Sequence, residues 1–165
     1  MKALVIYDSQ FGNTRRVAET IGAALGKVGE VAVVPVGDAN PDQLAGLDLL
    51  IVGSPTQRFN PTPATTNFLK RIPAGGLNGT RIAAFDTRFT VEDIEKIRIL
   101  AFFVRIFGYA AEKITRRLVS KGGIPAGEPG RFYVLDTEGP LLEGELERAT
   151  AWAIGAAAAS RASGL

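Results

Sequence analysis

An apolar run at the start of the chain breaks into a short polar loop that leads directly into an amphipathic helix. Residues 2–7 are nearly all apolar and partly β-branched, which is typical of a strand buried on both faces of a parallel sheet. From residue 13 or 14 the apolar spacing becomes helical, with Val17, Ile21, Leu25 and Val28 on one side. The sequence therefore predicts a strand, a polar turn and a helix that packs back on the strand.

The polar turn is predicted to bind a phosphate group. Gly12 lets the backbone turn and approach a ligand closely, while Ser9, Asn13 and Thr14 offer hydroxyl and amide groups. A helix N-terminus also presents unpaired N–H groups and the positive end of the helix dipole, so it holds an anion without a metal. The turn lacks both Gly-x-Gly-x-x-Gly and Gly-x-x-x-x-Gly-Lys-Ser/Thr, which excludes a Rossmann dinucleotide turn and an ATP or GTP P-loop.

Two missing residue types narrow the chemistry of the chain. Its 165 residues are sized for one domain, and 46% of them are hydrophobic, which predicts a substantial core. The chain has no cysteine and no histidine, so it has no thiol nucleophile, no histidine base, no cysteine-ligated metal and no histidine ligand for zinc. The apolar run at the N-terminus is too short for a membrane span or a secretory signal, so we expect no membrane span and a cytoplasmic location.

The net charge of +2 conceals a local excess of basic residues. Residues 96–121 contain seven basic side chains and one acidic side chain, so this stretch carries +6 and the rest of the chain −4. No run is dense enough for nucleic acid, and aromatic residues are not interleaved as a stacking surface requires. The basic stretch therefore either docks an acidic partner or forms a solvated helix face.

Apolar segments alternate with helical patterns along the rest of the chain, which predicts an α/β class with a parallel sheet. Further strands are expected at 30–36, 48–54, 81–87 and 131–136, and further helices at 41–46, 62–73, 109–121 and 143–159. Pro35 cannot donate to a ladder and places the second strand at a sheet edge. Right-handed crossovers then give a doubly wound, three-layer fold, whose ligand site lies in loops 8–14, 54–62 and 86–90.

Residues 91–107 form an additional segment that is apolar around most of a helix. Because a helix with apolar residues on most sides is unfavourable in water, other groups are expected to cover it. The sequence leaves three roles open for this segment. It could form a homodimer interface with a second copy of the chain, cover a bound ligand as a lid, or cap the core of its own domain.

Two of the three loops resemble those of a known family. The loop Ser9-Gln10-Phe11-Gly12-Asn13-Thr14 resembles the Ser/Thr-x-x-Gly-Asn-Thr loop by which flavodoxins bind the phosphate of FMN. The segment Gly53-Ser54-Pro55-Thr56-Gln57 resembles the Gly-Ser/Thr-Pro-Thr segment of flavodoxin-like proteins, notably the quinone reductases related to flavodoxin. The chain is thus identified as a flavodoxin-like protein. The resemblance implies a five-stranded parallel sheet of order 2-1-3-4-5 in one domain over residues 1–165, with an apolar helical insertion at about 91–107.

The resemblance also implies an FMN site without a metal and without a catalytic side chain. Its expected residues are Ser9, Gln10, Phe11, Gly12, Asn13, Thr14, Pro55, Thr56, Gln57, Arg58, Phe59, Asn60, Thr87, Arg88 and Phe89. Phe59 and Phe89 are candidates to stack on the flavin ring, although Phe59 could serve local packing and Phe89 could anchor the next helix. The 57–60 loop lacks a glycine, so a change of its backbone conformation against the flavin is expected to be difficult.

The implied function is an FMN-binding redox protein of flavodoxin type that carries electrons between protein partners. The alternative is an FMN-dependent NAD(P)H:quinone oxidoreductase, and a third reading is a regulatory module of the response-regulator type without flavin. That module would need an Asp after Gly53, where Ser54 stands. Electron-carrying flavodoxins are usually acidic, whereas this chain has a pI near 9.1, so acidic redox partners are expected.

Overall fold

The computed structural model describes residues 1–89 and 108–161. The predicted insertion at 91–107 lies outside the described residues, and with it the predicted homodimer, lid or core-capping role. Within the described ranges no helix is long and apolar enough to cross a membrane.

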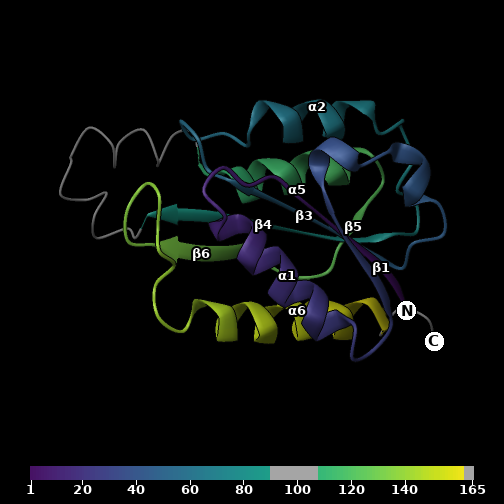
Figure 1. Ribbon diagram of the computed structural model, residues 1–165. Coiled ribbons are helices and arrows are strands. Elements are labelled where there is room, and N and C mark those ends of the chain that lie inside the picture. The colour runs from purple at the N-terminus through teal and green to yellow at the C-terminus, as the bar shows by residue number, and fades with distance from the viewer. Residues whose placement is uncertain (90–107, 162–165) are drawn as a thin grey trace.

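The described chain forms a parallel sheet between two layers of helices (Figure 1). The strand order is β2-β1-β3-β4-β5, and β6 also pairs with β4. The strands are β1 (Lys2–Tyr7), β2 (Glu30–Pro35), β3 (Leu49–Pro55), β4 (Arg81–Phe89), β5 (Ile124–Pro125) and β6 (Gly130–Val134). The predicted order 2-1-3-4-5 is confirmed, and β2 lies at the edge of the sheet, as predicted from Pro35.

The position of the fifth strand differs from the prediction of one strand at 131–136. Two short strands stand beside β4 in place of one. Strand β5 pairs with Arg81 and Ile82 of β4, and β6 pairs with Phe85–Phe89. The residues between them include Gly127, at φ 145°, and Pro129, which has no N–H to donate. A continuous ladder is therefore interrupted after Pro125 and resumes at Gly130.

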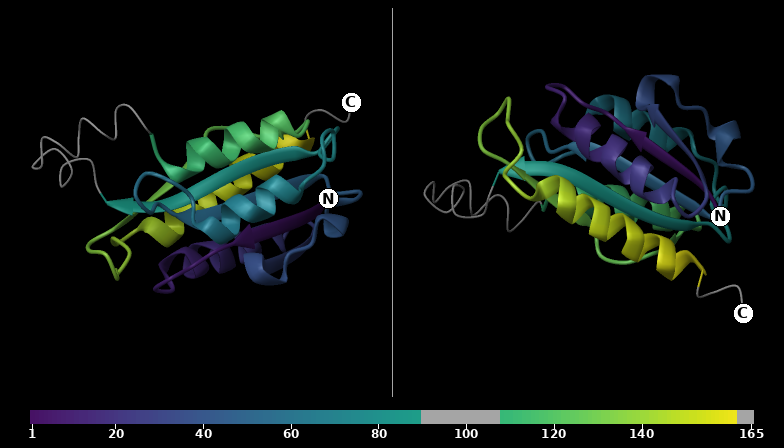
Figure 2. Two further views of the ribbon diagram at one scale, coloured as in Figure 1. Left: turned by 90° about the horizontal axis from the view of Figure 1, so that it is seen from above. Right: turned by 60° about the horizontal axis from the view of Figure 1, so that its bottom comes forward.

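Helices cover both faces of the sheet, as the two views of Figure 2 also show. The helices are α1 (Asn13–Leu25), α2 (Pro63–Arg71), α5 (Ala110–Ser120) and α6 (Glu145–Arg161), with 3-10 turns η1 (Val36–Asp38) and η2 (Pro41–Leu44). In Figure 1, α1 and α6 lie below the sheet and α2 and α5 lie above it. The helix predicted at 41–46 is the single 3-10 turn η2, in which Asn40 and Gln43 cap each other.

The alternation of side chains along β1 divides the core into two clusters. Ala3 and Val5 join the cluster beneath α1 and α6, whereas Leu4 and Ile6 join the cluster beneath α2 and α5. These strand residues are 3% exposed or less, so β1 is buried on both faces as its composition predicts.

Gly53, near the end of β3, has no room for a side chain. A Cβ at this position would overlap the ring of Phe85, which is fully buried. We expect Gly53→Ala to lower the free energy of unfolding by about 1–3 kcal/mol in urea denaturation, because the core must shift to admit the methyl group. The matched control is Gly155→Ala on the exposed side of α6, where nothing lies within 4 Å. That change should be neutral or stabilising, and equal losses in the two variants would contradict the overlap at Gly53.

Candidate functional site

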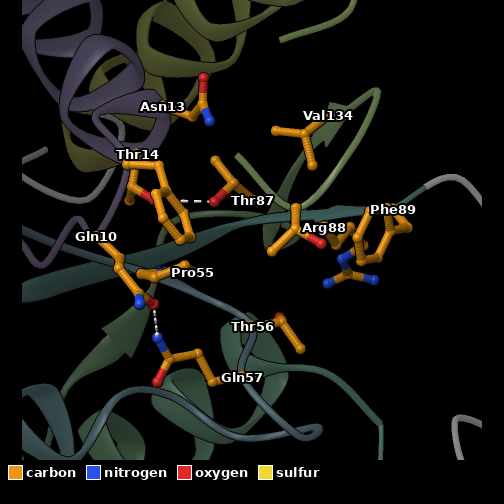
Figure 3. Close-up of a pocket in the computed structure, with 12 residues that line it drawn as sticks. Gln10, Asn13, Thr14, Pro55, Thr56, Gln57, Thr87, Arg88, Phe89 and Val134 are labelled. Atoms are coloured by element: carbon orange, nitrogen blue, oxygen red, sulfur yellow. Dashed lines mark hydrogen bonds between the residues drawn. The ribbon is translucent and has the colours of Figure 1, made fainter. Parts of the chain in front are cut away.

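The carboxyl ends of β1, β3, β4 and β6 gather at one edge of the sheet and surround a pocket of about 540 Å³, counting the space open to solvent. Figure 3 shows this pocket. Its lining residues are Gln10, Phe11, Asn13, Thr14, Pro55, Thr56, Gln57, Thr87, Arg88, Phe89, Val134 and Thr137. The lining thus includes residues from all three predicted segments, and those of the third segment, residues 87–89, belong to the end of β4 rather than to a loop.

The loop between β1 and α1 is held in shape by Ser9. The Ser9 hydroxyl oxygen accepts hydrogen bonds from the backbone N–H groups of Gly12, at 3.1 Å, and Arg15, at 3.2 Å. Gly12 precedes the first residue of α1 and has a left-handed φ of 91°, which glycine adopts at little cost. Ser9 and Gly12 therefore shape the loop from outside the pocket lining.

The same loop keeps a set of backbone donors free. Within the described part of the chain, no group accepts a hydrogen bond from the N–H groups of Gln10, Phe11, Asn13 or Thr14. These donors surround the N-terminus of α1, where the helix dipole adds positive potential. Unpaired donors on a loop of this shape are suited to a phosphate group.

The side chains of Asn13 and Thr14 brace the loop against its neighbours. Asn13 Nδ2 donates to the carbonyl oxygen of Glu138 at 3.0 Å, and the hydroxyl oxygens of Thr14 and Thr87 lie 2.8 Å apart in a buried position. These two contacts fix the start of α1 against β4 and the loop that follows β6. Sequence reasoning missed the 135–140 loop, which contributes Thr137 to the pocket, although its place after a strand at the same edge was a signal for it.

The loop after β3 turns tightly beside the pocket. The backbones of Gln57 and Asn60 exchange two hydrogen bonds of 2.8 Å, and Arg58 and Phe59 between them have φ values of 47° and 67°. This is the geometry of a two-residue hairpin turn, which here is made without glycine at about 1–2 kcal/mol for each left-handed residue. The side-chain amide of Gln57 also donates to Gln10 across the mouth of the pocket (Figure 3).

Several predicted site residues lie outside the pocket lining. Three residues of the predicted site belong to the hairpin but not to the pocket lining: Arg58, Phe59 and Asn60. The aromatic rings that line it belong to Phe11 and Phe89, which are 45% and 37% exposed. Of the two predicted stacking candidates, only Phe89 is therefore placed at the pocket.

Arg88 lines the pocket, but its guanidinium is engaged elsewhere. Its Nε and Nη2 atoms each lie 2.6 Å from an oxygen of Asp86, and Nη2 also lies 3.2 Å from Glu112 Oε2. The guanidinium stacks on Tyr109 at 3.5 Å from the ring centroid, and the Ala111 N–H donates to Asp86 at 2.9 Å. This cluster, which sequence reasoning did not identify, fastens β4 to the first turn of α5.

Burial dominates the ionisation of the cluster. It raises the pKa of the fully buried Asp86 carboxyl, and the Arg88 guanidinium and the Ala111 N–H offset that effect only in part. Burial also raises the pKa of Tyr109, whose buried hydroxyl has no hydrogen-bond partner among the described residues. The Asp86 carboxyl therefore depends on Arg88 for compensation of its burial.

The described lining of the pocket limits the chemistry of its side chains. It contains hydroxyls, amides, apolar groups and the ion-paired Arg88, and it includes no carboxylate. An anionic ligand is therefore not repelled, and the lining offers no evident general acid or base. Among the described residues there is also no group of acidic side chains that could hold a metal ion.

Comparisons with known proteins agree with this arrangement. A family model described as a flavodoxin domain matches residues 4–103. A flavodoxin from the domain Archaea has 23% identity and a TM-score of 0.77 over 98% of this chain and 99% of its own. Oxidised flavodoxin 2 from Bacillus cereus has 23% identity and a TM-score of 0.76 over 96% and 99%. A WrbA-like flavodoxin from Agrobacterium tumefaciens has 16% identity and a TM-score of 0.71 over 98% of both chains.

Proposed function

Because the chain belongs to the flavodoxin domain family, it is an FMN-binding redox protein of flavodoxin type, and we propose that the pocket at the carboxyl edge of the sheet holds the FMN. The observation that carries this assignment is the set of N–H groups at residues 10, 11, 13 and 14, around the start of α1, for which residues 1–89 and 108–161 provide no acceptor. Family membership also argues against the response-regulator reading.

The loops divide the recognition of FMN between them. The amides of the 10–14 loop would bind the phosphate, with Ser9 and Gly12 holding the loop in shape. The polar groups of Thr56, Gln57 and Thr87 and the exposed rings of Phe11 and Phe89 would surround the flavin. Arg58, Phe59 and Asn60 would act through the shape of their hairpin. When bound, FMN supplies the electron chemistry that the side chains of this site lack.

The function that this site supports best is that of an electron carrier between proteins. A carrier requires only binding, orientation and exposure of the cofactor, and the described pocket lining offers no evident proton donor. The basic pI favours acidic partners, since complementary charge raises the rate of encounter. Homodimerisation and a cytoplasmic location stay predictions from the sequence.

Turnover measurements separate the carrier from the oxidoreductase alternative. The purified protein with FMN is mixed with NADPH and a quinone, with and without an added flavodoxin reductase. A carrier oxidises NADPH only when the reductase is present, whereas multiple turnovers without it would establish the oxidoreductase instead.

A further inference from the structure

A groove runs between α2 and α5, and Asn60 of the 57–60 hairpin lines it. It has a volume of about 1040 Å³, counting the space open to solvent. The lining side chains that matter here are Asn60, Thr66, Lys113, Arg116, Arg117 and Ser120. Figures 1 and 2 show α2 and α5 side by side on the same face of the sheet.

The groove carries positive charge that the described residues do not neutralise. Lys113, Arg116 and Arg117 follow one another at helical spacing along α5, and no described carboxylate lines the groove. Arg116 and Arg117 are exposed and form no ion pair within the described ranges. Glu112, the acidic residue of the same helix, forms ion pairs with Arg88 and Arg131 at 3.2 Å each, and it does not line the groove.

The positive charge of the groove affects the pKa of Lys113. Its ammonium group donates to Asn60 Oδ1 at 2.7 Å, a neutral partner. Burial and the neighbouring Arg116 both lower the pKa of Lys113. An anion in the groove would relieve this repulsion.

The spread of the cations favours an acidic protein segment over a small anion. Four positions, about 6 Å along a helix, lead from Lys113 to Arg117, so the three cations form a row along one face of α5. Arg116 and Arg117 are also exposed, and an isolated exposed ion pair contributes little. Several carboxylates on one segment engage the whole row at once.

The 57–60 hairpin connects the groove to the pocket. Asn60 lines the groove and Gln57 lines the pocket, and their backbones share the two 2.8 Å hydrogen bonds of the turn. A molecule bound in the groove would therefore contact the same hairpin that borders the proposed flavin site. We propose that the groove between α2 and α5 is the docking surface for an acidic segment of the redox partner, which rests on the carrier function proposed above.

The test measures binding of a fluorescein-labelled hexaglutamate peptide to the FMN-loaded protein by anisotropy, so that FMN already fills the phosphate loop. The groove variant is Arg116→Gln with Arg117→Gln. The control is Lys2→Gln with Lys27→Gln, which removes two exposed cations outside the groove. We expect the groove variant to bind about fivefold more weakly and the control less than twofold more weakly. Binding should also weaken between about 0.01 M and 0.15 M ionic strength.

Amide NMR shifts supply a second readout that does not depend on the label. Hexaglutamate should shift the amides of Thr66 and of residues 113–117 more than those of the 9–14 loop. No binding, equal loss in both variants, or shifts centred elsewhere would overturn the docking surface. Stronger displacement by pyrophosphate than by unlabelled hexaglutamate would assign the groove to a phosphate ligand and overturn the acidic segment.

FMN titrations of the same variants keep the two proposals apart. If every variant binds FMN like the parent and hexaglutamate does not discriminate between them, only the docking surface is wrong. If the parent protein does not bind FMN, the proposed function fails and the docking surface fails with it.

Discussion

Replacing Arg88 with methionine is expected to lower the free energy of unfolding at pH 7 by about 3–5 kcal/mol, as measured by urea denaturation. The change leaves the fully buried Asp86 carboxyl without the guanidinium that contacts both of its oxygens at 2.6 Å. It also removes the stacking on Tyr109 and the 3.2 Å contact with Glu112. Since small domains are stable by only about 5–15 kcal/mol, the loss should be a large part of the total.

Two further variants show whether burial causes this loss. Arg15→Met removes a similar ion pair, with Glu19 at 2.7 Å, from a site where both side chains are more than half exposed, so the urea midpoint should hardly move. Removing both buried charges in Asp86→Leu with Arg88→Met should recover much of the stability, because no unpaired charge remains. A loss in Arg88→Met no larger than that in Arg15→Met would contradict a structural role for the pair.

The stability deficit of Arg88→Met should depend on pH in a defined direction. Burial already raises the pKa of Asp86 above its ordinary value of 3.8, and removing Arg88 takes away an effect that lowers it. An acid whose folded-state pKa is raised loses stability as the pH rises from its unfolded pKa through its folded pKa. Relative to the parent, the deficit should therefore be smallest below about pH 4 and grow as the pH rises.

Gly12→Val is expected to weaken FMN binding by about tenfold or more. Gly12 has a φ of 91°, which a β-branched residue adopts only with strain of about 1–3 kcal/mol. Nothing lies within 4 Å of a Cβ at this position, so the effect comes from backbone conformation rather than from collision with the protein. The loop should relax and carry the N–H groups of residues 10–14 away from their present arrangement.

Fluorescence titration with FMN measures this effect, and Gly12→Asn is its control. Asparagine tolerates the left-handed region better than valine, so Gly12→Asn should retain most of the FMN affinity. Equal losses in the two variants would contradict the conformational explanation. Thermal unfolding without FMN shows whether either variant has lost its fold instead.

The sequence was most informative where local pattern and burial agree. The apolar run 2–7 followed by helical spacing from Val17 predicted β1 and α1, and Pro35 predicted that β2 lies at an edge. The strand order came from family resemblance and is confirmed. The division of the fifth strand into β5 and β6 was missed because the interruption depends on Gly127 and Pro129, whereas the predicted strand began only at residue 131.

The site was predictable at the level of loops and less so at the level of side chains. The pocket lining includes residues of the predicted loops 8–14 and 54–62 and residues 87–89 at the end of β4, but it does not include Phe59, which lies in the tight 57–60 hairpin. Asp86 and Arg88 stand two residues apart on a strand and share one side of it, which was a signal for their pairing. Their partners are Tyr109, which directly precedes α5, and Glu112 in its first turn, and only tertiary packing brings them there.

The most direct test of the phosphate assignment compares the dissociation constants of FMN and riboflavin, measured by flavin fluorescence on the flavin-free protein. Riboflavin has the same ring system and lacks only the phosphate. If backbone N–H groups of residues 10–14 bind that phosphate, FMN should bind about 100-fold more tightly or better, since each hydrogen bond to a charged group contributes about 1.5–3 kcal/mol. Equal affinities for the two flavins would contradict a phosphate site at the start of α1.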